Sequence, residues 1–385
     1  MKASRVVSLF ALVAGMSALW SPIAATAATH KLSPGDPMQA VVDAAAPGDT
    51  VIFAAGDYYG VAAGTGAAAL RVTKPLKLIA KSKISKGVKV RILPGPGNAH
   101  GIVVEPANPG DPDIDGVMIK GFTVEGFSNN GIWLKHVQNF KIQGNEAINN
   151  LENGIWPTLS ANGSVKKNVA YGSQDSALWV EASENVRVLK NEFHSSPTGF
   201  EVTISKDVFA MKNYIHDNTV GVGLYHPSAA GLPYTDGPMP FGNWVIKKNT
   251  IVNNNAPNSA PPGSMSGALP PGIGVLVLGV DNVTVENNEI TGNTFIGVAQ
   301  IDFCFAVDGT SFDCATNPPE VADTDPADNT YVKNTVTGNG SGTPPPGFTG
   351  FNRDIVALST ATTNCFSKND YDTGLFFPDP PTVCQ

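Results

Sequence analysis

A repeat of 22 to 23 residues in the middle of this chain constrains its fold more than any other feature. Four successive copies share a short apolar strand, an Asn, a polar turn and a second apolar strand. They read FKIQGNEAINNLENGIWPTL, SVKKNVAYGSQDSALWVEA, VRVLKNEFHSSPTGFEVTI and VFAMKNYIHDNTVGVGLY. A fixed period of this length predicts stacked units, each of which contacts only its neighbours. The marker asparagines are Asn145, Asn168, Asn191, Asn213, Asn249, Asn288, Asn334 and Asn369.

Such a repeat has room for three short strands and three turns, which make one coil of a parallel β-helix. Successive coils then pair at a rise of about 4.8 Å. We therefore predict an all-β, single-stranded solenoid of about ten coils over residues 28–385. Marker steps of 36, 39, 46 and 35 predict loop insertions from about residue 226 onward, and residues 371–385 are expected to cap the C-terminal end.

The marker asparagines are interpreted as structural. Asn tolerates the left-handed backbone of a tight turn, and stacked amides can hydrogen-bond from coil to coil. His194 and His216 follow a marker Asn by three residues and are interpreted as turn residues.

The N-terminal part carries a resemblance to a known family. A predicted amphipathic helix over Met38 to Ala46 leads into GDTVIF and then GDYY. This opening, with the Asn-marked coils, resembles pectate-lyase-like parallel β-helix proteins, which implies a right-handed solenoid with a short N-terminal capping helix. The NTD and GHG motifs of polygalacturonase-like hydrolases, the DPHD motif of mannuronan epimerases and the RxPxxR segment of pectate lyases are absent. The resemblance thus implies a fold and a polysaccharide substrate, and leaves the reaction open.

The first residues predict export. Lys2 and Arg5 precede an apolar run from Val6 to Trp20, and an A-x-A cleavage site ends at Ala27. This pattern is typical of a signal peptide over residues 1–27, cleaved near Ala27. No later stretch approaches the roughly 20 apolar residues of a membrane helix. We expect a protein that is secreted into a periplasm or out of the cell, without membrane insertion.

The net charge limits the classes of partner that we expect. The formal net charge of −8 loses two positive charges with the signal peptide. This balance argues against binding of nucleic acid, and binding of an acidic polymer would need a local Lys cluster or a bound cation.

The four cysteines predict two disulfides in an exported protein. Three pairings are possible, and proximity favours Cys304 with Cys314 and Cys365 with Cys384.

Strand alternation predicts which side chains of the Gly-opened strands face solvent. The inward pairs are predicted to be Ile132 with Leu134, Ile155 with Pro157, Leu178 with Val180, Phe200 with Val202, Val222 with Leu224, and Ile273 with Val275. Trp133, Trp156 and Trp179 then form an outward row that is followed by Glu201. Indole faces suit sugar rings, so we expect this row, with His226, to bind substrate. The alternative is that the insertions cover the row as additional core.

Several titratable residues share this face. Lys135, His136 and Tyr225 are candidate bases for a lyase or epimerase, and Glu181 and Glu201 are candidate catalytic carboxylates. Asp175, Glu181 and Glu201 are oxygen ligands that could hold calcium, which is the one cofactor the sequence suggests.

The sequence favours a monomeric, polysaccharide-modifying protein, a lyase or epimerase of an acidic polysaccharide, with a glycoside hydrolase less favoured. The alternatives are a glycan-binding protein without turnover and a structural protein of the cell surface.

Overall fold

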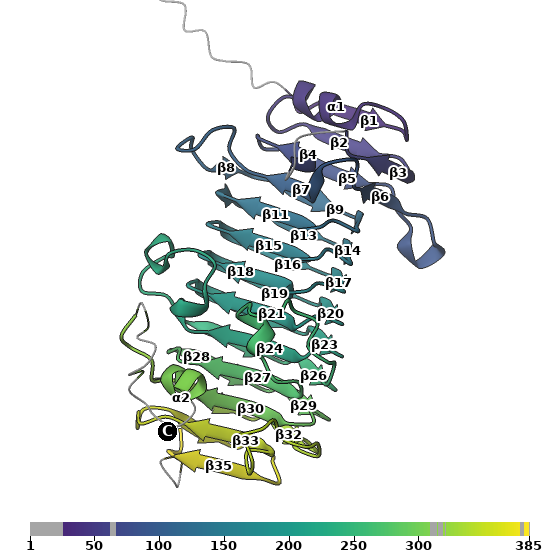
Figure 1. The fold of residues 1–385 in the computed structure, drawn as a ribbon. Coiled ribbons are helices and arrows are strands. Elements are labelled where there is room, and N and C mark those ends of the chain that lie inside the picture. The colour runs from purple at the N-terminus through teal and green to yellow at the C-terminus, as the bar shows by residue number, and fades with distance from the viewer. Residues whose placement is uncertain are drawn as a thin grey trace, which may run out of the picture.

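A computed structural model describes residues 26–61, 67–308, 314, 319, 321–377 and 381–384. The chain winds into a rod of stacked coils with α1 at one end and β35 at the other (Figure 1). Its strands form three parallel sheets of 14, 10 and 11 strands, called sheets A, B and C here. The predicted all-β parallel β-helix is therefore confirmed. The proposed signal peptide lies almost wholly outside the described residues.

The elements have the following bounds. Sheet A comprises β1 (Thr29–Leu32), β2 (Thr50–Phe53), β5 (Lys77–Ala80), β8 (Ile114–Asp115), β9 (Met118–Lys120), β12 (Val137–Gln138), β13 (Lys141–Gln143), β16 (Ala161–Lys166), β19 (Glu184–Leu189), β22 (Lys206–Met211), β25 (Trp244–Lys247), β28 (Val283–Glu286), β31 (Thr330–Val332) and β34 (Cys365–Ser367). Sheet B comprises β3 (Gly56–Tyr59), β6 (Val90–Leu93), β10 (Thr123–Glu125), β14 (Glu146–Ile148), β17 (Val169–Tyr171), β20 (Glu192–His194), β23 (Tyr214–His216), β26 (Thr250–Val252), β29 (Glu289–Thr291) and β32 (Thr335–Thr337). Sheet C comprises β4 (Ala67–Val72), β7 (Asn98–Val104), β11 (Ile132–Lys135), β15 (Ile155–Thr158), β18 (Ser176–Glu181), β21 (Thr198–Thr203), β24 (Val220–Tyr225), β27 (Ile273–Leu278), β30 (Ile296–Ile301), β33 (Arg353–Leu358) and β35 (Gly374–Phe377).

Helices are short. The predicted N-terminal helix is α1 (Met38–Ala44), which buries Met38 and Val42 against the first coils. α2 (Phe303–Asp308) lies in an insertion, and single 3₁₀ turns occur at Ile84–Lys86, Pro227–Ala229, Tyr234–Asp236 and Ser266–Ala268. Among the described residues, no helix is long and apolar enough to cross a membrane.

The core runs along the rod axis and is built from inward side chains of all three sheets. The predicted inward pairs of sheet C are buried, with one correction. In β27 the inward pair is Val275 with Val277, while Ile273 belongs to a second apolar cluster together with Leu276. The prediction was wrong for Ile273 because this residue lies at the corner where the chain enters β27, beside the insertion that precedes it.

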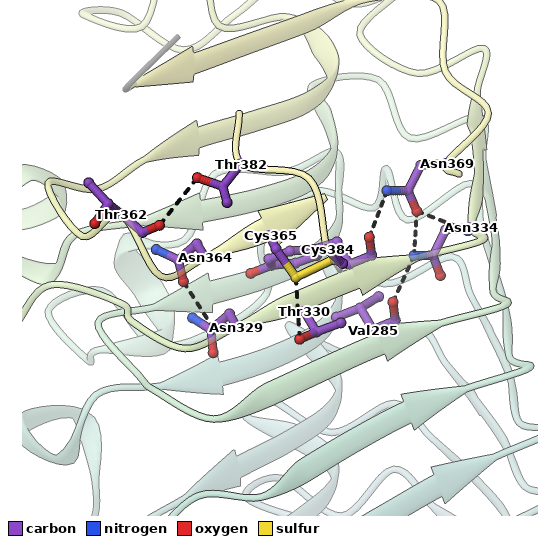
Figure 2. The surroundings of a disulfide bond; sticks show 11 residues. Val285, Asn329, Thr330, Asn334, Thr362, Asn364, Cys365, Asn369, Thr382 and Cys384 are labelled. Carbon is purple, nitrogen blue, oxygen red and sulfur yellow. Dashed lines mark hydrogen bonds between the residues drawn. A yellow bond between two sulfur atoms is a disulfide. The ribbon is translucent and has the colours of Figure 1, made fainter. Parts of the chain in front are cut away.

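The marker asparagines form the predicted ladder. The Asn168 side-chain amide donates to Asn191 Oδ1 at 3.0 Å and to the Ile142 carbonyl at 3.0 Å, and Asn191 Oδ1 also accepts the Asn168 backbone N–H at 2.9 Å. The same pattern runs to Asn369, whose Oδ1 accepts from Asn334 at 2.9 Å (Figure 2). A second ladder passes through Asn218, Asn254, Asn293 and Asn339.

The left-handed backbone lies one residue earlier than predicted. Lys190, directly before Asn191, has φ 57°, and the residue before each of the other markers is likewise at positive φ. The marker asparagines themselves are absent from the positive-φ residues. The exposed residue therefore makes the turn, which leaves the Asn amide free to point inward.

Both disulfides follow the pairing that proximity favoured. Cys304 of α2 bonds to Cys314, and Cys365 of β34 bonds to Cys384. Figure 2 shows the second bond beside the Asn334–Asn369 step of the ladder. The adjoining backbone is paired as well, since Phe366 N donates to the Thr382 carbonyl at 2.8 Å. This disulfide thus ties the C-terminal segment to the last coils.

Substitution of one ladder residue should destabilise the whole rod. In Asn191→Ala, the buried backbone N–H and side-chain amide of Asn168 lose their shared acceptor. Unsatisfied buried donors cost about 1–3 kcal/mol each, so we expect the free energy of unfolding to fall by about 2–5 kcal/mol in urea titrations. Asn162→Gly is the control, since Asn162 is exposed at φ 56° and Gly accepts that conformation. Equal stability of the two variants would contradict a structural role for the ladder.

Candidate active site

A groove of about 640 Å³ lies on the outer face of sheet C. Its floor is formed by outward side chains of β18, β21, β24, β27 and β30. Its walls are the insertions around residues 229–231, 261–270 and 345–351, together with α2, which Figure 1 shows in front of β27 and β30. The insertions therefore flank the Gly-opened strands, as their positions in the sequence predicted.

Two rows of outward side chains follow from the strand register. The first row contains Trp133, Trp156, Trp179, Glu201, Gly223, Leu276, Ala299 and Val356. The second row, two residues further along each strand, contains Lys135, Thr158, Glu181, Thr203, Tyr225, Leu278, Ile301 and Leu358. Side chains of successive coils thus lie about 4.8 Å apart within each row. Each row begins with aromatic and polar residues and becomes apolar from β27 onward.

The Trp side chains stack on one another. The ring centroids of Trp133 and Trp156 are 5.1 Å apart at an interplanar angle of 8°, and those of Trp156 and Trp179 are 5.3 Å apart at 11°. His100 covers the other face of Trp133 at 5.2 Å. The expectation that indole faces would be free to stack on sugar rings was therefore wrong. Both faces of Trp133 and Trp156 are covered, because the coil spacing is also a favourable aromatic stacking distance.

Trp179 is 6% exposed and is the Trp that lines the groove. Its indole N–H donates to Thr203 Oγ1 at 2.8 Å. Gly231 of the first insertion lies against its ring, so closely that a Cβ there would come within 2.9 Å of it. The insertion therefore covers the end of the Trp row, in line with the alternative weighed for the sequence.

An acid cluster, defined here as Asp175, Glu201 and Tyr225, lines one end of the groove. Tyr225 comes from the second row, yet its ring lies over Gly223, where a Cβ would be 2.2 Å from the ring. Gly223 is the register partner of Glu201, so only a glycine at this position lets the phenol approach the carboxyl group. The Tyr225 hydroxyl lies 3.3 Å from Thr198 Oγ1.

Burial raises the pKa of every member of this cluster. Burial raises the pKa of Glu201 well above its usual value, and the neighbouring charge of Asp175 raises it further, while the Ser176 hydroxyl donates to its Oε2. Burial and the charge of Glu201 raise the pKa of Tyr225 well above 10. Burial also raises the pKa of Asp175, against the effect of a hydrogen bond from the Ser266 hydroxyl. Burial therefore favours the neutral forms of Glu201 and Tyr225, in which both side chains can donate hydrogen bonds.

Glu181 anchors the first insertion. Its Oε1 accepts the backbone N–H groups of Gly231 at 2.6 Å and Leu232 at 3.1 Å, and its Oε2 accepts from Thr158 Oγ1 at 3.4 Å. The residue is fully buried, and burial raises its pKa to about 7. With both oxygens engaged, the structure does not support the catalytic and metal-binding roles that the sequence suggested.

The predicted bases from the neighbouring coil lie away from the groove. Lys135 opens the second row, and half-exposed His136 pairs with Asp113 at 3.5 Å. Neither residue lines the groove. His226 is fully buried: its Nε2 contacts the Asp323 carbonyl at 2.9 Å, its Nδ1 accepts the Ser228 N–H at 3.1 Å, and its ring stacks on Phe303 at 4.5 Å. These contacts join the first insertion to α2, and His226 is not among the residues that line the groove.

The donor set does not fit the expected calcium ion. Among the residues that the structure describes, no group of three or more His, Cys, Asp or Glu side chains could hold a metal. Glu181 is engaged by the first insertion and Asp175 by Ser266, so the three expected ligands do not converge.

Two parts of the site were missed from the sequence. Glu152 also lines the groove. Burial and the charge of Asp175 raise the pKa of Glu152. The apolar floor from β27 onward was also missed, although the strands IGVLVL and IGVAQI carry apolar residues at both alternating positions. Such continuous runs indicate strands that are covered on both faces.

Comparisons with known proteins agree with this architecture. Residues 100–302 match the family model described as "Right handed beta helix region". Among solved structures, the chain is similar to the A-module of the mannuronan C-5 epimerase AlgE4 of Azotobacter vinelandii, with a TM-score of 0.63 and 16% identity over 90% of this chain and 95% of that one. It is also similar to the periplasmic alginate epimerase AlgG, with a TM-score of 0.56 and 15% identity over 86% of this chain and 70% of that one. No curated protein matched the sequence.

The buried Glu181 predicts a pH-dependent stability. Folding raises the pKa of Glu181 from 4.5 to about 7. The contribution of this residue to the free energy of unfolding is therefore fully present below pH 4.5 and is lost as the pH rises through 7. We expect the free energy of unfolding to fall between pH 5 and 8, and Glu181→Gln, which cannot ionise, to reduce that fall by about 1–3 kcal/mol. Urea titrations of both proteins at the two pH values measure this. An identical fall in the variant would show that another group is responsible.

Proposed function

Because the chain belongs to the right-handed β-helix family, we propose that it is a polysaccharide-modifying enzyme, a lyase or epimerase of an acidic polysaccharide that reacts at the acid cluster. The observation that carries the proposal is the position of two buried groups, Glu201 and Tyr225, at the end of a groove, where burial favours their protonated forms. The epimerase names of two proteins with a similar fold support the choice of substrate class.

Both reactions start by removal of the proton on C5 of a uronic acid unit, which places additional negative charge on its carboxylate group. Neutral donors that are fixed in a dry site stabilise such charge strongly. A protonated carboxylic acid beside a tyrosine hydroxyl is one known arrangement of this kind. Glu201 would donate a hydrogen bond to the substrate carboxylate, and Tyr225 is the proposed proton donor. This arrangement compensates for the lack of Lys and Arg among the described residues that line the groove.

Asp175 is the proposed base. It is the partly exposed member of the acid cluster, so a sugar in the groove can reach it. Burial raises its pKa, which makes its ionised form a stronger base than an exposed Asp. In a lyase, Tyr225 would give its proton to the leaving O4 oxygen as the C4–O bond breaks. In an epimerase, Tyr225 would give its proton to C5 from the face opposite Asp175.

The disulfides support a proposal for the compartment in which the protein acts. Two disulfides are typical of chains that fold in an oxidising compartment. We propose that the protein is exported by its N-terminal signal peptide and acts on the polymer as a monomer, in a periplasm or outside the cell.

Glycoside hydrolysis is a second candidate. It is favoured by one observation, the two carboxyl groups Asp175 and Glu201 in a single cluster, where burial raises the pKa of both and that of Glu201 well above its usual value. A protonated carboxyl group can serve as general acid and an ionised one as base or nucleophile. Glycan binding without turnover is the outcome if neither reaction occurs.

Activity on polymannuronate and other acidic polysaccharides tests the proposal, with absorbance reporting unsaturated uronic products and proton NMR reporting C5 inversion. Tyr225→Phe should lower kcat by about 10²–10³-fold, since it removes the proton donor. Asp175→Asn should lower it by about 10²–10⁴-fold, because the base is lost.

Glu201→Gln separates the two candidate reactions. A Gln side chain still donates a hydrogen bond but cannot transfer a proton, so a lyase or epimerase should retain most of its activity and keep it at higher pH than the wild type. Glu201→Ala should be inactive, and Glu289→Gln, at an exposed position on sheet B, is the matched control. Loss of activity in Glu201→Gln, together with new reducing ends from the wild type and no unsaturated product, would replace the proposal by hydrolysis.

A further inference from the structure

The groove changes character along its length. Beyond the acid cluster its floor consists of Leu276, Leu278, Ala299 and Ile301, which are the outward residues of β27 and β30. Its walls there include Phe303 and Phe305 of α2 and Phe348 and Phe351 of the last insertion. The second apolar cluster of the protein therefore lies outside the coil, around an open space rather than around a filled core.

The apolar floor of the groove is left uncovered, and this requires a physical explanation. Elsewhere on the described outer faces, as in β19, β22 and β28, the strands alternate between buried and more exposed positions. Insertions in this region could have filled the space with side chains, yet about 640 Å³ remains accessible along the groove. Pockets of this size with mostly apolar walls and a few polar groups are typical of small-molecule sites.

The apolar floor adjoins the acid cluster directly. Leu276 is the register partner of Gly223 and Leu278 is that of Tyr225, so both lie one coil beyond the phenol ring. One coil is about 4.8 Å, which is less than the length of a sugar unit. A sugar that places its carboxylate at Glu201 would therefore hold its own substituents, or those of the next unit, against these leucines.

We propose that this part of the groove binds an uncharged alkyl or acyl chain that is attached to the glycan, so that the substrate is an acylated polysaccharide or a glycolipid. The sugar position rests on the proposed function, whereas the binding of the chain rests on the groove alone. The polar end offers the Glu201 carboxyl, the Tyr225 hydroxyl and Ser266 to a hydroxyl-rich ring, and the described residues at the apolar end offer hydrocarbon and aromatic rings. The ligand therefore has a sugar at one end and a chain at the other.

Hexyl, heptyl and octyl glucosides and glucuronides, each below its critical micelle concentration, serve as probes in calorimetric titrations of the full protein. Each methylene group that is buried contributes about 0.8 kcal/mol, so the dissociation constant should fall about fourfold for each added carbon. Octanol tests the contribution of the sugar, and should bind at least tenfold more weakly than octyl glucoside and octyl glucuronide.

Two variants locate the site. Ala299→Phe places a ring in the floor and should abolish the dependence on chain length, and Leu278→Ser should weaken octyl binding by about tenfold. Val332→Phe is the matched control, because Val332 ends a strand of sheet A away from the groove. Circular dichroism establishes that each variant is folded.

The outcomes separate this inference from the proposed function. Affinity that does not depend on chain length, or that is unchanged in Ala299→Phe, would overturn it even if polysaccharide activity is found. Equal affinity for octanol would reject the glycan and leave only an apolar ligand. A chain-length trend in a protein without activity on any polysaccharide would support the inference and reject the proposed function.

Discussion

Each coil of this protein can satisfy its backbone only by pairing with the coil before it and the coil after it. Along the strands, the hydrogen bonds of three parallel sheets join successive coils. At the turns, where the sheets are interrupted, the asparagine ladders supply the hydrogen bonds between coils. A buried amide with unpaired donors is costly, so the ladder holds successive coils in one register. Insertions of different lengths are tolerated because they leave from the corners and return to the same ladder.

The candidate site depends on that register. Glu201 and Tyr225 belong to different rows of adjacent coils, and they meet because Gly223 leaves room for the phenol ring. The insertions then remove water from the cluster. Glu181 holds the first insertion over the Trp row, and Ser266 of the second insertion contacts Asp175. Rigid coils thus place the reactive groups, and the insertions set their environment.

Burial beneath the insertions changes which charge states are favoured in the groove of this acidic protein. The chain carries a formal charge of −8, and ionised carboxylates in the groove would repel an acidic polymer. Burial instead favours the neutral forms of Glu201 and Tyr225, which converts them into donors. The same desolvation explains why the groove can combine carboxyl groups with an apolar floor, since neutral acids cost less to bury than ions.

The sequence by itself determined the coil architecture, the outward rows, the favoured disulfide pairing and the structural role of the marker asparagines. These follow from a period of 22 to 23 residues and from alternation along a strand, which are local patterns. Only the tertiary structure decided that the indole faces are stacked, that Glu181 and His226 hold the first insertion, and that Lys135 and His136 lie outside the groove. It also decided that Glu201 is buried, which favours its protonated form. The contacts of Glu181 and His226 join residues that are 50 and 97 positions apart, where an insertion meets a strand, and neither period nor alternation contains that information. The stacked indoles lie one repeat apart, and strand alternation gives the face of the sheet that they share but not the orientation of their rings.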